Sequence, residues 1–165
     1  MENALNLQIR PLTHSDQAFL WECLYFAIHV PLGTPLPGLD ILKSPDLSKY
    51  VADWGRDTDF GFLAFDSVAS KNLGALWLRQ FTTYNAGYGY VDDQIPELNM
   101  AVVPDSRGWG IGSRLLEHLF AQGKYPAISL SVSPQNPAIK LYKRVGFKKV
   151  VEKGGSWTML WKKPG

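Results

Sequence analysis

The sequence predicts a single α/β domain over residues 1–165, with a mixed, mostly antiparallel sheet and helices on both faces. A chain of 165 residues with 45% hydrophobic and 19% charged residues is large enough to bury one core. Strand and helix patterns alternate along it without an internal repeat or a linker. The strand–helix–strand unit over 97–132 requires a crossover and therefore a parallel pair, whereas the other strands have hairpin spacing.

The first third of the chain predicts a strand, a helix and a long loop. Residues 5–9 alternate apolar and polar side chains, as a half-buried strand does. A helix then runs to about residue 28, and its N-cap candidates are Thr13, Ser15 and Asp16. Four prolines within 29–48 exclude a long helix there, and a second short helix is expected over 47–54.

The middle of the chain predicts a hairpin followed by a loop. Residues 59–65 and 74–81 have strand patterns, and the polar stretch 67–72 between them forms the turn. A polar loop over 82–94 comes next and enters a short strand at 88–91.

The back half is the most regular part of the sequence. We expect, in order, strand 97–103, helix 108–122, strand 127–132, helix 136–145 and strands 147–152 and 156–162. The first of these helices carries an apolar stripe of Ile111, Leu115 and Leu119. In the second, Asn136 is the N-cap and Gly146 ends the helix.

A glycine-rich turn over 107–112 lies between a predicted strand and a predicted helix, an order that favours anion binding. The free N–H groups of a helix's first turn point at one spot, where the helix dipole adds about half a positive charge. Glycines let the backbone approach a phosphate closely, and Arg107 adds a cation. The turn therefore predicts a diphosphate site.

Two common diphosphate motifs do not match this turn. It is not a P-loop, because no Gly-Lys-Ser/Thr sequence closes it. The spacing of Gly108, Gly110 and Gly112 also differs from the dinucleotide fingerprint, and no acidic residue ends a strand about 20 residues further on.

Two motifs in the back half resemble the GNAT superfamily of acetyl-CoA-dependent N-acetyltransferases. Residues 107–112 read Arg-x-x-Gly-x-Gly, which is similar to the family's pyrophosphate loop. Residues 136–147 read Asn-Pro-Ala-Ile-Lys-Leu-Tyr-Lys-Arg-Val-Gly-Phe and resemble the family's next helix. Residues 96–104 resemble the strand before the loop, and the earlier part of the chain carries no such signature.

The resemblance implies transfer of an acetyl group from acetyl-CoA to a primary amine of a small molecule or peptide, by direct attack. In this family the pantetheine arm lies where two parallel strands splay apart, here 97–103 and 127–132. Acetyl-CoA is a co-substrate, and its implied contacts are Met100, Ala101, Val102, Arg107, Gly108, Trp109, Gly110, Ile111, Gly112, Ser113, Asn136 and Tyr142. Asn136 is also a good N-cap, and both of its roles can hold together.

The resemblance also implies two catalytic groups, each with a structural alternative. Glu97 is the candidate base because it starts the strand that reaches the thioester; the alternative is a solvated carboxylate. Burial beside a cleft would raise its pKa toward neutrality. Tyr142 matches the tyrosine that donates a proton to the CoA sulfur, and the alternative is a tyrosine packed on the sheet. A backbone N–H of Met100 or Ala101 would hold the thioester carbonyl.

The amine acceptor stays open at this stage. The segments 24–55, 82–95 and 152–158 would form its site, with Tyr25, Phe26, Trp54, Tyr84, Tyr88, Tyr90 and Trp157 and the carboxylates Asp40, Asp92 and Asp93. Aromatic rings with carboxylates suit an amine cation, but they equally suit an ordinary core with an acidic rim. A catalytically silent acyl-CoA sensor is the alternative function, and a nucleotide-binding protein is disfavoured because the P-loop lysine is missing.

Composition limits the partners. A net charge of +2 does not indicate nucleic acid, and the eight Lys and Arg residues within 140–163 are expected on solvated faces, some near the CoA 3′-phosphate. The single Cys23 cannot form an internal disulfide, which favours a reducing cytoplasm and a buried thiol over a catalytic one. We expect no signal peptide in residues 1–3, no membrane span and no metal at the isolated His14, His29 and His118; a homodimer is left open.

Overall fold

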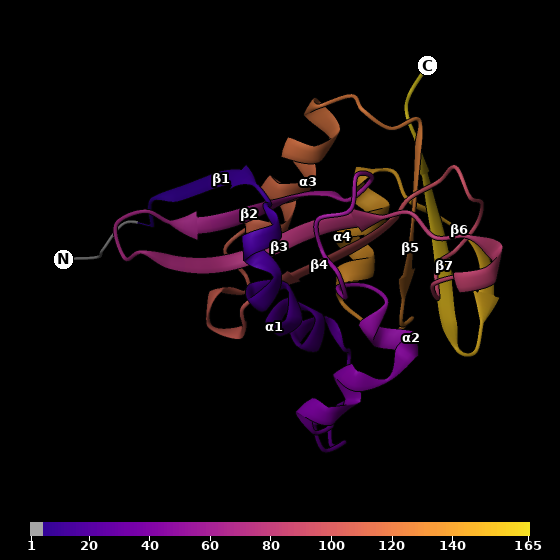
Figure 1. Ribbon diagram of the computed structural model, residues 1–165, viewed down its shortest axis with the longest axis horizontal. Helices are drawn as coiled ribbons and strands as arrows, with labels where there is room; N and C mark the ends of the chain where they lie inside the picture. Colours follow the sequence, from indigo (N-terminus) through magenta and orange to yellow (C-terminus); the bar gives the residue numbers. More distant parts are fainter. Residues whose placement is uncertain (1–4) are drawn as a thin grey trace.

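A seven-stranded mixed sheet forms the centre of the molecule (Figure 1). The computed structural model describes residues 5–165, so the residues used above to exclude a signal peptide lie outside the described part. The sheet has the order β1-β2-β3-β4-β5-β7-β6. Its strands are β1 (Leu7–Pro11), β2 (Phe60–Asp66), β3 (Lys71–Arg79), β4 (Glu97–Val102), β5 (Ala127–Val132), β6 (Lys148–Lys153) and β7 (Ser156–Lys162). Within the described residues β4 and β5 pair in parallel and the other neighbours pair antiparallel, which confirms the predicted fold class.

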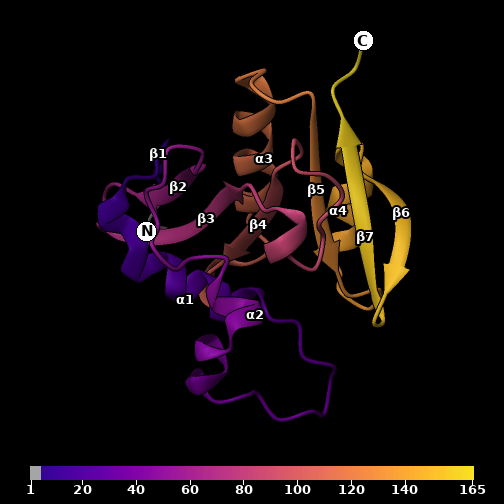
Figure 2. The ribbon, with the colours of Figure 1, turned by 45° about the vertical axis from the view of Figure 1, so that its right-hand side comes forward.

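Four α-helices and four short 3-10 segments connect the strands. The α-helices are α1 (Gln17–Ala27), α2 (Pro45–Ser48), α3 (Ile111–Ala121) and α4 (Ala138–Val145). The 3-10 segments are η1 (His14–Asp16), η2 (Leu39–Lys43), η3 (Thr83–Asn85) and η4 (Pro104–Ser106). The proline-rich segment between α1 and α2 extends away from the sheet, as four prolines within 29–48 require (Figure 2).

The sheet has a separate apolar core on each face. The first core joins α3 and α4 to the side chains of Leu98, Leu130 and their neighbours. The second joins α1 and the segment after α2 to Ala75, Trp77 and Ala101. Successive side chains of a strand point to opposite faces, so Leu98 faces α3 and α4 whereas Glu97 and Asn99 face α1 and α2.

The parallel pair separates almost as soon as it forms. Glu97 and Ser129 are its registered pair, and the Ser129 N–H donates to the Pro96 carbonyl oxygen at 3.0 Å. Beyond this point β4 and β5 diverge, and in Figure 1 β1 to β3 run across the view while β5 to β7 run up it. The predicted splay is therefore present, and it opens toward the carboxyl end of β4.

Two local predictions were wrong. Residues 88–91 form turns instead of a short strand, with the Tyr90 N–H donating to the Gly87 carbonyl oxygen at 3.2 Å. A Cβ on Gly89 would lie 2.7 Å from the Ser131 nitrogen, so this loop packs closely on β5. The short helix predicted over 47–54 ends earlier, at Ser48, and continues as turns.

Candidate active site

The open edge of β4 presents backbone groups to the gap. The Val103 N–H donates to the Leu73 carbonyl oxygen at 2.8 Å. In an antiparallel ladder the backbone N–H of every second residue before it, including Ala101, therefore also points toward β3. The backbone N–H groups of Met100 and Val102 then point toward β5, where the strands have separated. Of the two backbone donors predicted for the thioester carbonyl, this register favours Met100, because the Ala101 amide points away from the gap.

The glycine-rich turn after β4 has open space next to its backbone, where side chains at Gly108 and Gly110 would lie. Gly108 and Gly110 have φ angles of +83° and +80°, a left-handed conformation that favours glycine. A Cβ on either residue would have no atom within 4 Å, and Trp109 between them is exposed. Gly110 is the N-cap of α3, so the N–H groups of the first helical turn lie beside this open space.

Packing and the Arg107 side chain fix the turn. A Cβ on Gly112 would lie 3.2 Å from the Met100 Cε, so this glycine allows α3 to approach β4 closely. Arg107 donates to the carbonyl oxygens of Val102 at 3.3 Å and Phe26 at 3.2 Å, which ties the turn to α1. Together these contacts hold the backbone donors at one spot.

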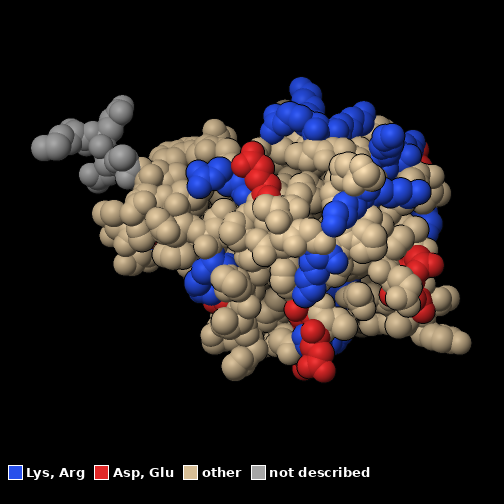
Figure 3. Space-filling model, turned by 90° about the horizontal axis from the view of Figure 1, so that it is seen from above, with Lys and Arg blue, Asp and Glu red and all other residues tan. Residues whose placement is uncertain are grey.

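Arg144 is a site residue that motif reasoning did not single out. Its Nη2 donates to the Ser113 Oγ at 2.9 Å, which brings a second cation to the start of α3. The eight basic residues within 140–163 are all exposed, and Figure 3 shows Lys and Arg grouped on the face seen from above with few carboxylates among them. Their charge was predictable from the sequence, but which of them reaches the turn was not, because that depends on how α4 packs against α3.

Tyr142 lies in the core between α4 and the sheet. Burial raises the pKa of its phenol to about 12, so the group stays protonated at neutral pH. Its ring packs edge-to-face on Phe147 with centroids 5.7 Å apart. Asn136 Oδ1 accepts from the Ala138 N–H at 2.9 Å, a capping contact, although α4 begins at Ala138 and its N-cap residue is Pro137, one residue later than predicted.

Glu97 is buried on the opposite face of the sheet. Its exposed fraction is 2%, and its Oε1 accepts from the Gly89 N–H at 2.8 Å. Burial raises its pKa to about 7, and the Tyr50 hydroxyl, the Gly89 N–H and the Lys49 ammonium limit that rise because they favour the carboxylate. The predicted upward shift in pKa is confirmed, and the solvated strand-end carboxylate is not what the structure has.

Two buried polar atoms lie unpaired beside Glu97. Asn99 Nδ2 and Ser129 Oγ have no hydrogen-bond partner among residues 5–165. Asn99 is two residues along β4 from Glu97, and Ser129 is its registered neighbour on β5. Buried polar groups are nearly always paired, so two unpaired ones where the strands separate indicate a place that a ligand completes.

The comparisons with known proteins identify the family. The family model described as acetyltransferase (GNAT) domain matches residues 60–149, more than half of the chain. The chain belongs to the GNAT acetyltransferase family. It is 27% identical over 130 residues to the 5-NmdU N-acetyltransferase of Pseudomonas phage PaMx11, an alignment that covers 74% of this chain and 89% of that protein.

Solved GNAT structures share the fold. The PaiA N-acetyltransferase of Thermoplasma acidophilum, solved in complex with coenzyme A, superposes with a TM-score of 0.65 at 19% identity, covering 96% of this chain and 99% of that one. A GNAT-family acetyltransferase of Streptococcus pneumoniae gives a TM-score of 0.61 at 22% identity, covering 95% and 99%. The protein is thus an acyl-CoA-dependent N-acyltransferase of the GNAT type.

The site of this GNAT protein fits the chemistry of an acyl-CoA. The open space above Gly108 and Gly110 is a cradle that a Cβ would fill, and free N–H groups at the start of α3 suit a diphosphate. The unpaired strand edge at Met100 suits an amide chain. The unpaired atoms of Asn99 and Ser129 are buried polar groups that a bound ligand would pair.

The residues predicted for the acceptor site lie in different environments. Trp54 is buried in the second core beneath the Arg79 guanidinium, and Trp157 faces the first core, with the ammonium groups of Lys143 and Lys149 above its ring. Tyr84 is fully exposed. A cavity of about 100 Å³ is lined by Asp46, Lys49, Ala86, Gly87 and Tyr88, and of these residues Gly87 lies against the Glu97 carboxylate.

The remaining polar residues do not form a second centre. Within residues 5–165 no group of three or more His, Cys, Asp or Glu side chains is placed to hold a metal ion. His118 packs edge-to-face on Phe62 with centroids 4.5 Å apart. Cys23 is buried, and burial raises the pKa of its thiol, which disfavours a thiolate nucleophile. No helix in this range has the length and hydropathy to cross a membrane.

Proposed function

We propose that the protein transfers an acetyl group from acetyl-CoA to a primary amine by direct attack, with Glu97 as base and Tyr142 as acid. One observation supports this proposal: Glu97 lies on the α1 and α2 face where β4 pairs with β5, whereas Tyr142 lies in the core on the opposite face. An amine that enters from the α1 side meets the carboxylate. A thiolate that leaves toward α4 meets the phenol.

The pKa values suit these roles. An alkyl ammonium has a pKa of about 10, so a base must remove its proton at neutral pH. With a pKa of about 7, Glu97 is partly ionised there and can accept this proton directly or through water. The amine nitrogen attacks the thioester carbon, the C–S bond breaks, and the buried Tyr142 gives its proton to the sulfur.

The backbone supplies the rest of the site. The Met100 N–H is proposed to hold the carbonyl oxygen as it gains negative charge, while the strand edge through Val102 binds the pantetheine arm. The diphosphate is proposed to lie against residues 107–113, with Arg144 as an additional cation. Asn136 is proposed to orient the start of α4 beside the cofactor.

The acceptor is proposed to be a small molecule or peptide that carries a primary amine. The named phage relative acetylates 5-NmdU by its description, so 5-NmdU belongs in the acceptor panel with polyamines, amino acids, aminoglycosides and peptides. Thiol release from acetyl-CoA reports turnover for each acceptor. Binding of acetyl-CoA without turnover on any amine would replace the enzyme by the sensor hypothesis.

The pH dependence of the best acceptor tests the base. We expect kcat/KM to rise with pH along a limb near 7 that disappears in Glu97→Gln. This variant should lose most activity at neutral pH and recover part of it at high pH, where more amine is already neutral. Glu117→Gln, on the exposed face of α3, is the matched control and should keep the wild-type profile. A Glu97→Gln protein with the wild-type rate and profile would reject Glu97 as the base.

A further inference from the structure

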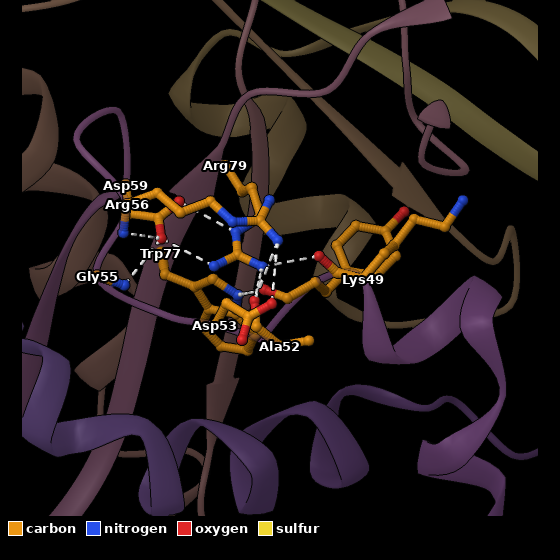
Figure 4. A network of polar contacts seen from close by, with 9 residues as sticks. Lys49, Ala52, Asp53, Gly55, Arg56, Asp59, Trp77 and Arg79 are labelled. Atoms are coloured by element: carbon orange, nitrogen blue, oxygen red, sulfur yellow. Dashed lines mark hydrogen bonds and ion pairs between the residues drawn. The ribbon is translucent and has the colours of Figure 1, made fainter. Parts of the chain in front are cut away.

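The turn after α2 is clamped to β3 by a buried arginine. Arg79 is 1% exposed and forms an ion pair with Asp59 at 2.8 Å (Figure 4). Its Nη1 also donates to the carbonyl oxygens of Lys49 at 2.9 Å and Ala52 at 2.6 Å. One guanidinium therefore fixes two points of the backbone on either side of Tyr50.

A second side chain of β3 fixes the residue between those points. The Trp77 Nε1 donates to the Tyr50 carbonyl oxygen at 3.0 Å. The Tyr50 ring packs edge-to-face on Phe81 with centroids 5.2 Å apart and stacks on Tyr88 at 6.4 Å. The direction of the Tyr50 side chain is thus determined by both its backbone and its neighbours.

The hydroxyl of this clamped tyrosine lies close to the proposed base. The Tyr88 N–H donates to the Tyr50 Oη at 2.7 Å, and the Gly89 N–H, one residue further on, donates to the Glu97 Oε1 at 2.8 Å, so the two oxygens lie side by side and the proton of the phenol is available to the carboxylate. A Cβ on Gly87 would lie 2.6 Å from both the Tyr50 Oη and the Glu97 Oε1, so this glycine closes the contact from outside. Arg79 and Glu97 are direct neighbours across β3 and β4, which places the clamp and the carboxylate at one level of the sheet.

We propose that Tyr50 is a positioning residue for Glu97, held by the Arg79 clamp, and that its hydroxyl orients the carboxylate and stabilises its charged form. The inference rests on the proposed role of Glu97 as base. Burial raises the pKa of Tyr50, so the phenol remains a donor throughout the pH range of activity.

The other polar groups around Glu97 do not replace this contact. Lys49, from the turn after α2, donates to the Ala86 carbonyl oxygen at 2.7 Å and acts on the carboxylate only through its charge. Arg79 on β3 is neutralised by Asp59. On β4 and β5 the neighbours are the uncharged Asn99 and Ser129, and the loop contributes the Gly89 N–H and the Tyr88 phenol.

The test is Tyr50→Phe, which keeps the ring and removes the hydroxyl. Hydrogen bonds to charged groups are strong enough that their loss should raise the pKa of Glu97 by about one unit. We expect the limb of kcat/KM to move upward by about one pH unit and the rate at pH 7 to fall about fivefold, with recovery at high pH. Tyr125→Phe is the control, because that ring packs on Phe60 against the core on the other face of the sheet.

A titration of the Glu97 carboxyl by ¹³C NMR separates this inference from the proposed function. A higher pKa of Glu97 in Tyr50→Phe, with the value in Tyr125→Phe unchanged, supports the positioning role even if another residue proves to be the base. An unchanged pKa would overturn the inference while leaving the Glu97→Gln result to decide the base. A rate that falls equally at every pH, without movement of the limb, would also overturn it, because loss of packing alone gives that result.

Discussion

The two sides of the gap between β4 and β5 are built in opposite ways. On the proposed cofactor side, residues 107–110 of the turn are exposed, and the start of α3 leaves backbone N–H groups beside an open space. On the side of the proposed base, Glu97 is 2% exposed, and the loop that contains Gly87 and Gly89, together with Tyr50, encloses it. The first side consists of consecutive residues, whereas the second is assembled from segments far apart in the chain.

The difference shows how one gap can serve two substrates. A diphosphate carries its own charge and needs donors that are already in place, so an open turn of glycines at a helix start is sufficient. A base must have its pKa adjusted, and only burial with chosen partners achieves this. The backbone conformation of the glycine turn therefore determines the proposed cofactor site, and the surroundings of Glu97 determine the proposed base.

A larger side chain in the glycine turn should have the largest effect on function. We expect Gly110→Val to abolish acetyl-CoA binding, because the new side chain occupies the space above the turn and strains a backbone with φ of +80°. Isothermal titration calorimetry measures the affinity. Gly155→Val is a matched control, since Gly155 has φ of +81° and equally open surroundings in the turn between β6 and β7. Tight CoA binding by folded Gly110→Val would contradict the placement of the diphosphate.

Removing the proposed acid should have the next largest effect. We expect Tyr142→Phe to lower kcat by about one to three powers of ten with little change in acetyl-CoA affinity. The ring keeps its packing on Phe147, so the fold is preserved. Steady-state kinetics with Tyr84→Phe as an exposed control provides the measurement. Wild-type turnover in the phenylalanine variant would leave Tyr142 with a packing role only.

Replacing Glu97 by the uncharged glutamine should have the smallest effect, which is a change in the pH dependence of stability. The pKa of Glu97 is higher in the folded protein, about 7, than the ordinary 4.5, so folding favours the protonated form. Its contribution to stability is therefore greatest at low pH and is lost as pH rises through about 7. The free energy of unfolding of Glu97→Gln, relative to wild type, should increase by about 1–3 kcal/mol between pH 5 and pH 8.

Chemical denaturation at several pH values measures this difference. Subtracting the wild-type curve removes the titration of the groups that both proteins share. A constant difference across this pH range would mean that Glu97 is ionised in the folded protein at pH 5. The pKa of Glu97 would then not differ from that of an ordinary solvated carboxylate.

The sequence by itself determined the parts of the protein that depend on consecutive residues. The hairpin of β2 and β3, the β4–α3–β5 crossover and the glycine turn were predictable, because periodicity, capping and glycine conformation act within a few residues. Glu97 could be selected because its strand precedes that turn. Its raised pKa was predictable in direction only.

Only the tertiary structure decided which distant groups meet Glu97. Tyr50 has the pattern of a core residue in a short helix, and nothing near it in the sequence indicates that its hydroxyl reaches β4. The same holds for Arg144 at Ser113 and for Trp157 beneath two lysines. These contacts depend on how helices and loops pack across the sheet, and packing is set by the shape of the whole core and not by local propensity.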